Sequence, residues 1–469
     1  MPSHFTNFHN RKHSMMQSGL NELLIQNQEG KNGLNHDHPK IQALNAHIQK
    51  REHFHNRFGI IAHLLERIAL FFMKIFKPFL RKDHQQYYYA TLRQKYLEAL
   101  LNHDTAAADE YKNELKFSGE DPEWVKSAIV WFETYAVNMK TPEYIKYKTI
   151  NDFNYKIKEL DRPLRVAVIG DWGTGDHLAA SVLEQVFLKE PDLIIHLGDI
   201  YYSGTHKEFK DHYLDIIDNL RKKYKPIPVY NLPGNHDYYS GGHPFYEALK
   251  VNEGLEGSPP VQEASYFVLS NSVWHLQGMD TGYHDHDVRK VNEDNTELVT
   301  EEIPWHHHHL DKAIAANKKV LLFSHHQLFS RYTAIGSKCY NPKLLECFKP
   351  YIDKKQITAW FWGHEHLFEV YKPFLGLDKG RCVGHGAVPI LYENGLPYKT
   401  TATVKKQKIP LQELPETLLD PTKLTNDGDI YDRGFVMLNL KNDGTGTADY
   451  YAARYGLDTE LLLNFSEDL

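Results

Sequence analysis

The amino-acid sequence predicts a layered α/β fold that follows a helical region. From about residue 163, apolar segments typical of strands alternate with segments of helical periodicity. The strands are near-continuous apolar runs, which indicates a sheet that is buried on both faces. Each run ends in a cluster of polar residues, at the position where open α/β sheets bind ligands.

The predicted elements follow one another in a regular order. "LRVAVIGD" and "DLIIHLGD" are strands, each followed by a helix, "DHLAASVLEQVFLKE" and "KEFKDHYLDIIDNLRKKY". "PIPVYNLPGNHD" is a third strand, and "KKVLLFSHHQ" and "ITAWFWGHEH" are later ones. Residues 433–456 predict two strands joined by a Gly-containing turn. The Pro-, Thr- and Lys-rich residues 391–428 are expected to form an insertion loop.

The first 150 residues have a different character. Residues 1–50 are polar and rich in His, Asn and Gln, which predicts a flexible arm. Residues 51–150 have apolar residues at helical spacing, so we expect a helical region. Residues 58–82 fit either a basic amphipathic helix on a membrane surface or a helix packed within the protein. Charged residues interrupt this segment, so its uncharged runs are too short to span a bilayer.

Composition limits the classes of protein. The 469 residues carry a net charge of −7, which gives no support for a nucleic-acid partner. Three cysteines are too few for a disulfide framework and fit a reducing compartment. With no secretory signal near the start, we expect a cytoplasmic protein.

Five predicted strand ends carry residues that bind metals. Their sequences are "GDWG", "GDIYY", "GNHD", "SHHQ" and "GHEH". Together they supply carboxylates, a phenol, an amide and several imidazoles, a set that suits iron, manganese or zinc. Two metal ions sharing a bridging carboxylate would use such a set without any cysteine. The "HHHH" at 306–309 instead predicts a surface helix without a ligand role.

The ordered blocks resemble the calcineurin-like metallophosphoesterases, and most of all their purple acid phosphatase branch. That branch has the ordered blocks GDxG, GDxxY, GNH[DE], VxxH and GHxH. In this chain the fourth block reads "LFSH", a mild departure in which Leu322 stands in place of the valine. The resemblance covers residues 163–456, the expected catalytic domain, and implies a layered α/β/β/α sandwich. It also implies two metal ions, iron together with zinc, manganese or a second iron.

The resemblance implies a role for each matching residue. Asp171, Tyr202 and His366 would bind the first metal, Asn235, His325 and His364 the second, and Asp199 would bridge both. His236 would be the proton donor. Asp237 is expected to orient its imidazole, or else to be an ordinary surface residue. Tyr201 is expected to pack on the opposite side from Tyr202 if the segment is extended.

A further departure concerns the substrate contacts. Where the branch often has another histidine, this chain has Ala334, so Arg331 or His326 is the candidate for binding phosphate. The resulting hypothesis is hydrolysis of phosphate monoesters, with a metal-activated hydroxide as nucleophile. A phosphodiesterase using the same site, or a binding or scaffold protein using the helical N-terminal region, stays open. A protein serine/threonine phosphatase fits less well, because the second block reads "GDIYYSG".

Overall fold

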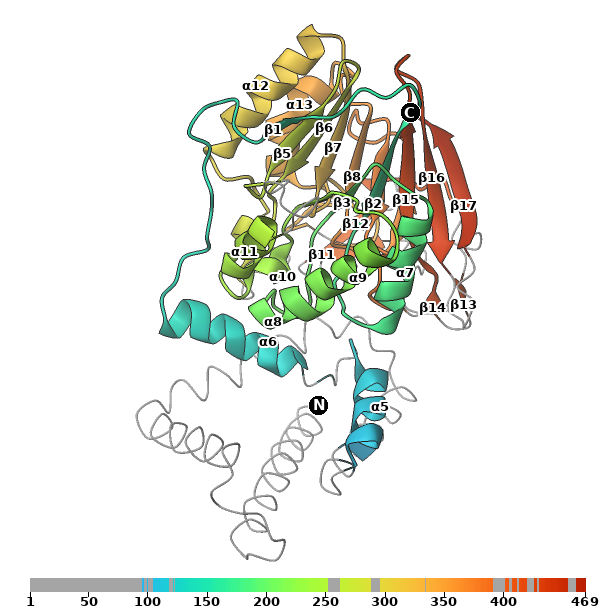
Figure 1. Cartoon of the computed structure of the whole chain (residues 1–469). Helices are drawn as coiled ribbons and strands as arrows, with labels where there is room; N and C mark the ends of the chain where they lie inside the picture. Colours follow the sequence, from blue (N-terminus) through green and yellow to red (C-terminus); the bar gives the residue numbers. More distant parts are fainter. Residues whose placement is uncertain are drawn as a thin grey trace, which may run out of the picture. The chain divides into compact units, whose positions relative to one another are not determined.

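A computed structural model describes most of the chain from Thr105 onward (Figure 1). The described residues are 95–96, 99, 104–117, 121, 123–251, 262–287, 296–333, 335–390, 401–404, 407–410, 413–419, 426–427, 430–453 and 461–469. The predicted arm at 1–50 and the amphipathic segment at 58–82 lie outside them. Among the described helices, none has the length and apolar character needed to cross a membrane.

The chain divides into two compact units. The first comprises residues 1–74 and 81–121, and its described helix is α5 (Thr105–Leu115). Asp104 begins this helix, since its carboxylate accepts a hydrogen bond from the Ala107 N–H at 3.0 Å. The second unit comprises residues 75–80 and 122–469. It therefore includes α6 (Glu123–Phe132) and the π-helical turn η2 (Glu133–Val137), which the sequence had grouped with the N-terminal helical region.

A six-stranded sheet forms one layer of the second unit. Its strand order is β17-β16-β15-β2-β3-β4, with β2, β3 and β4 parallel and β15, β16 and β17 antiparallel. The bounds are β2 Leu164–Ile169, β3 Leu193–His196, β4 Val229–Asn231, β15 Arg433–Leu440, β16 Gly446–Ala453 and β17 Leu461–Asp468. β17 is a strand that the sequence analysis did not predict.

A seven-stranded sheet forms the second layer. Its order is β1-β5-β6-β7-β8-β10-β9, and β6, β7, β8 and β10 are parallel. The bounds are β1 Asn154–Lys156, β5 Phe267–Ser270, β6 Trp274–Met279, β7 Lys319–Ser324, β8 Ala359–Trp362, β9 Phe368–Val370 and β10 Gly380–Val383.

Alternating side chains hold the layers together. Along β2, Val166 and Val168 enter the apolar core between the sheets, whereas Ala167 and Ile169 face the helices α7 and α9. On the far face of the other sheet, α12 and α13 pack against β7 and β8. The helix bounds are α7 His177–Leu188, α8 His206–Glu208, η3 Phe209–Leu214, α9 Asp215–Lys223, α10 Asn235–Tyr238, α11 His243–Val251, α12 Glu302–Ala315 and α13 Pro342–Ile352. The predicted α/β/β/α sandwich is confirmed.

Two regions differ in detail from the sequence analysis. The helix containing "HHHH" is present as α12, but His306 and His309 are buried. His306 contacts the Glu302 carboxylate at 2.7 Å, and His309 contacts the Ile150 carbonyl at 2.7 Å. In the predicted insertion loop, the described residues include two hairpins, β11–β12 (Thr401–Val404, Gln407–Pro410) and β13–β14 (Asn426–Asp427, Ile430–Tyr431), the second of which ends just beyond that range.

Candidate metal centre

The polar clusters meet because they follow strands whose carboxyl ends lie at one edge of the sandwich. Asp171 follows β2, Asp199 follows β3 and His325 follows β7, which belongs to the other sheet. Their ligand atoms nevertheless all lie within 4.8 Å of one another. The two sheets therefore contribute to one site.

The first group of ligand atoms surrounds a phenol. Tyr201 Oη lies 3.0 Å from Asp171 Oδ1, 3.1 Å from Asp199 Oδ2 and 2.9 Å from His366 Nε2. His366 Nε2 lies 3.6 Å from Asp171 Oδ1. Two carboxylates, a phenol and an imidazole thus converge on one small volume.

This phenol belongs to Tyr201, whereas the sequence analysis had assigned the position to Tyr202. The ring of Tyr202 packs edge-on against Trp124, with centroids 4.6 Å apart. The expected alternation fails because the segment is a turn rather than an extended strand. Glu208 holds that turn, since its carboxylate accepts the backbone N–H groups of Tyr202 at 2.5 Å and of Ser203 at 3.2 Å.

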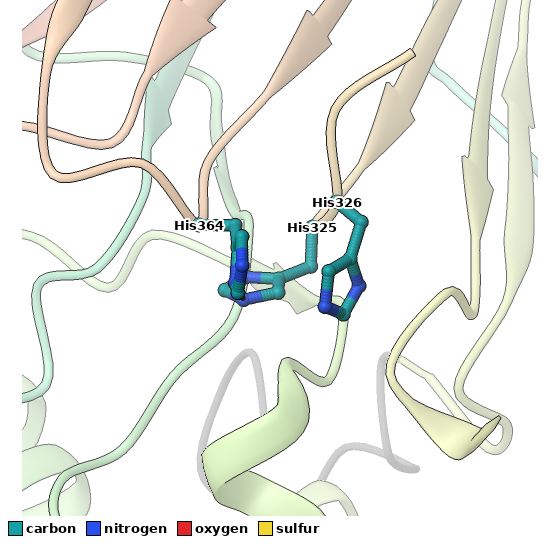
Figure 2. Close-up of side chains that lie close together, drawn as sticks. All are labelled: His325, His326 and His364. Carbon is teal, nitrogen blue, oxygen red and sulfur yellow. Dashed lines mark hydrogen bonds between the residues drawn. The ribbon is translucent and has the colours of Figure 1, made fainter. Parts of the chain in front are cut away.

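The second group contains an amide and two imidazoles. Asn235 Oδ1 lies 3.2 Å from His325 Nε2 and 3.1 Å from His364 Nδ1. The two imidazole nitrogens are 3.3 Å apart. Figure 2 shows the rings of His325 and His364 close together, with His326 beside them. Asp199 Oδ2 lies 3.5 Å from His325 Nε2, so this one carboxylate adjoins both groups.

Hydrogen bonding around the second group leaves acceptors facing acceptors. His325 Nδ1 donates to the Leu197 carbonyl at 2.9 Å, so Nε2 of the neutral ring is a lone pair. Asn235 donates its Nδ2 to Tyr239 Oη at 2.6 Å, which leaves its oxygen pointing to the site. The His325 lone pair therefore faces the oxygens of Asn235 and Asp199. His364 Nδ1, which lies 3.3 Å from this lone pair and 3.1 Å from Asn235 Oδ1, carries at most one proton for these acceptors. A cation held between these atoms resolves the mismatch, and the donor set fits a metal ion.

Burial keeps the imidazoles in the metal-binding form. It lowers the pKa of His325 to about 3 and the pKa of His366 to about 4, and it lowers the pKa of His364 as well. Burial and the charge of Asp199 raise the pKa of Asp171. Among the described residues, the ion-pair partners of Asp171 and Asp199 are histidines, not Lys or Arg. The carboxylates are thus buried without a fixed cation, as at a metal site.

The backbone is shaped to bring these groups together. Asp171, Asp199 and His364 all have positive φ angles, of 54°, 74° and 65°. Non-glycine residues rarely adopt this conformation, and where they do it is concentrated at functional sites. Gly234 permits the closest approach, because a Cβ there would lie 2.0 Å from Asp199 Oδ1.

His236 lies beside the site with one nitrogen fixed. Its Nδ1 donates to the Tyr202 carbonyl at 2.7 Å, and its Nε2 lies 3.9 Å from Asp199 Oδ2. Its own backbone N–H donates to Asp199 Oδ1 at 3.1 Å. The ring therefore presents Nε2 to the candidate metal ligands.

Asp237 does not orient that imidazole. Its Oδ2 accepts the backbone N–H groups of Gly234 at 2.7 Å and Asp199 at 2.9 Å, and its Oδ1 accepts that of Ile200 at 3.0 Å. It is fully buried rather than on the surface. Asp237 is therefore a positioning residue that joins the loops after β3 and β4.

Comparison with known proteins now places the domain that carries this site. Residues 164–368 match the family model for calcineurin-like phosphoesterase. This segment is a calcineurin-like phosphoesterase domain. It contains every predicted metal ligand, from Asp171 to His366, whereas α6 and β15–β17 lie outside it.

The phosphoesterase domain is also similar to curated plant proteins. Purple acid phosphatase 21 of Arabidopsis thaliana is 22% identical over 283 residues, which cover 57% of this chain and 58% of the relative. Probable inactive purple acid phosphatase 9 of Arabidopsis thaliana is 21% identical over 209 residues, covering 41% and 31%. The chain thus spans little more than half of the first relative's length. The matches support the likeness to the purple acid phosphatase branch.

Two solved structures align with similar coverage. The protein titled GAP50, the anchor in the inner membrane complex of Plasmodium, aligns with a TM-score of 0.42 and 14% identity, over 66% of this chain and 89% of that one. A dimetal phosphatase from Danio rerio aligns with a TM-score of 0.40 and 13% identity, over 65% and 100%.

The two predicted substrate contacts differ in their surroundings within the phosphoesterase domain. His326 lies against His364, with ring centroids 4.4 Å apart, and its Nε2 faces Asp285 Oδ2 at 3.1 Å. Arg331 is buried, and its Nη1 donates to the Pro415 carbonyl at 2.9 Å. The structure thus places His326 beside the candidate metal ligand His364, and gives Arg331 a backbone partner in the 413–419 segment.

Two residues that shape the site were missed by the sequence analysis. Glu208 fixes the Tyr201–Tyr202 turn, and Tyr239 orients the Asn235 amide. The pattern "THKE", Thr205 to Glu208, is a capping-box signature that could have identified Glu208. For Tyr239 the available signal was its position four residues after Asn235, which one turn of α10 brings beside it.

We expect Asp237→Asn to lower the free energy of unfolding by about 1–3 kcal/mol, because an amide nitrogen would face at least one buried N–H donor. Chemical denaturation of both proteins measures the change. The matched control is Asp176→Asn at the start of α7, where asparagine caps a helix as well as aspartate does. Equal stability of the Asp237 variant and the control would contradict the positioning role.

Proposed function

We propose that this protein hydrolyses phosphate monoesters at a two-metal site in the phosphoesterase domain. The observation that carries the proposal is the mismatch at His325, whose lone pair faces the oxygens of Asn235 and Asp199. Asp171, Tyr201 and His366 would hold one metal ion, Asn235, His325 and His364 the other, and Asp199 would contact both. Such a pair, here iron with zinc, manganese or a second iron, activates water and clamps the phosphoryl oxygens.

The protein side chains then have separate tasks. His236, with both ring nitrogens protonated, would donate the proton of Nε2 to the leaving oxygen, while its Nδ1–H stays bonded to the Tyr202 carbonyl. His326 is the better placed of the two phosphate-binding candidates, because it adjoins His364. Asp237 and Glu208 keep the ligand-bearing loops in place through backbone N–H groups.

Metal analysis of the purified protein, combined with an aryl phosphate and the matching bis-aryl phosphate diester, tests the proposal. We expect monoester hydrolysis that is lost on chelation and restored by added metal. Preference for the diester would replace the monoesterase with a phosphodiesterase. Bound metal with no turnover of either ester would favour the binding-protein alternative, and absence of bound metal would overturn the site itself.

The tyrosine assignment can be tested by colour. A phenolate bound to ferric iron gives a charge-transfer band in the visible. We therefore expect the iron-loaded, oxidised protein to lose this band in Tyr201→Phe and to keep it in Tyr202→Phe. Visible absorption at matched iron content makes the comparison. Bleaching by the Tyr202 change alone would restore the assignment made from the GDxxY spacing.

A further inference from the structure

Helix α6 precedes the phosphoesterase domain in the chain and packs onto its site. Within the helix, the side chains of Trp124, Ser127, Ala128 and Trp131 are buried. The spacing of 0, 3, 4 and 7 residues puts all four on one face. α6 belongs to the same compact unit as the two sheets, so this face is a contact within that unit.

The N-terminal half of α6 contacts the loop that carries the Tyr201 phenol. Ser127 Oγ donates to the Tyr202 carbonyl at 3.2 Å and accepts from Ser203 Oγ at 2.6 Å. Trp124 packs edge-on against Tyr202. The Tyr202 carbonyl is also the acceptor for His236 Nδ1. The helix and the proton donor therefore share one carbonyl oxygen.

Aromatic rings surround His236 on several sides. Its ring centroid lies 6.0 Å from that of Trp124, 4.7 Å from that of Tyr201 and 4.8 Å from that of Tyr239. Tyr201 and Tyr239 come from the loops after β3 and β4, whereas Trp124 comes from α6. The Trp124 ring thus limits the space into which the imidazole can turn.

We propose that Trp124 and Ser127 are positioning residues for His236, so that a helix outside the family domain completes the catalytic site. This inference rests on the proposed hydrolase function. Ser127 fixes the carbonyl that accepts from Nδ1, and Trp124 restrains the ring. Both keep Nε2 directed at the leaving group, because the position of a proton donor decides how well it acts.

The C-terminal half of α6 and the adjoining η2 make hydrogen bonds of their own to the domain. The effect of Trp124 and Ser127 on His236 can therefore be separated from the packing of the helix as a whole. Trp131 Nε1 donates to the His286 carbonyl at 2.7 Å, and Tyr135 in η2 donates to the Tyr238 carbonyl. Trp131→Phe is therefore a matched control. It alters a buried tryptophan on the same face, two turns away, whose indole N–H is bonded to the His286 carbonyl.

The first test compares Trp124→Ala, Trp124→Phe, Ser127→Ala and Trp131→Phe in the full chain at equal metal content, with aryl phosphates of increasing leaving-group pKa. We expect Trp124→Ala to slow the hydrolysis of esters with poor leaving groups by about 10-fold and to leave the hydrolysis of esters with good leaving groups nearly unchanged. This loss is a part of the roughly 10²–10⁴-fold that general acid catalysis contributes. Ser127→Ala should show the same trend more weakly, Trp124→Phe should recover most of the loss, and the control should show none. An equal loss across the series, or no loss, overturns the inference.

A second readout does not depend on turnover. Diethyl pyrocarbonate acylates accessible imidazole nitrogens, and peptide mass spectrometry reports its rate at His236. We expect faster acylation in Trp124→Ala than in the wild type and in Trp131→Phe. An unchanged rate overturns the restraint by Trp124. If the wild type hydrolyses no ester, the proposed hydrolase function fails, whereas the acylation rate still decides whether α6 restrains His236.

Discussion

Asp199→Asn is expected to lower metal content and to reduce kcat by at least about 10²–10³-fold, the usual cost of removing one charge-stabilising group from an active site. Oδ2 of this residue lies 3.1 Å from Tyr201 Oη and 3.5 Å from His325 Nε2, so it adjoins both ligand groups. Oδ1 accepts the His236 N–H. Asparagine cannot replace both carboxylate oxygens, because its amide has one acceptor oxygen and one donor nitrogen.

Elemental analysis of the purified variant, with turnover of an aryl phosphate, measures the effect. Asp218→Asn is the matched control, since this carboxyl is 56% exposed on α9. The control should keep both metal content and rate. Normal metal content and rate in Asp199→Asn would exclude a bridging role. Loss of metal with an unfolded circular dichroism spectrum would instead assign the residue to stability.

Much of this site was predictable because its information is local. Each ligand follows an apolar run, and "LRVAVI" before Asp171 or "KVLLFS" before His325 is a strand by composition alone. Parallel strands bring their carboxyl ends to one edge, so ordered motifs become neighbours in space. The fold class and the neighbourhood of the ligands were therefore predictable from the sequence.

The parts that were not predicted depend on the geometry of a turn and on contacts between distant residues. The choice between Tyr201 and Tyr202 follows from the turn that Glu208 holds, which a rule for extended chains cannot represent. The task of Asp237 depends on N–H groups of Asp199 and Ile200. The contact of Trp124 with His236 joins residues more than 100 positions apart. Such pairs carry no periodic signal along the chain.

The second large effect is expected for His236→Ala. This change should leave both metal ions bound, because His236 contributes no ligand atom to the two groups and its backbone N–H to Asp199 is kept. The chemical step should slow by about 10²–10⁴-fold for esters with poor leaving groups, the typical worth of general acid catalysis. An ester with an acidic phenol as leaving group needs little protonation, so its loss should be much smaller.

Single-turnover rates for a nitrophenyl and an alkyl phosphate, at equal metal content, separate the possible roles of His236. His243→Ala is the matched control. This imidazole lies at the start of α11, a helix without a proposed ligand, and pairs with the Glu143 carboxylate. The control should leave the ratio of the two rates unchanged. If His236→Ala slows both esters equally, His236 binds the phosphoryl group rather than protonating the leaving oxygen. If it also lowers metal content, the imidazole supports the ligand loops, and the donor must be sought elsewhere, with His326 and its partner Asp285 as the next pair to test.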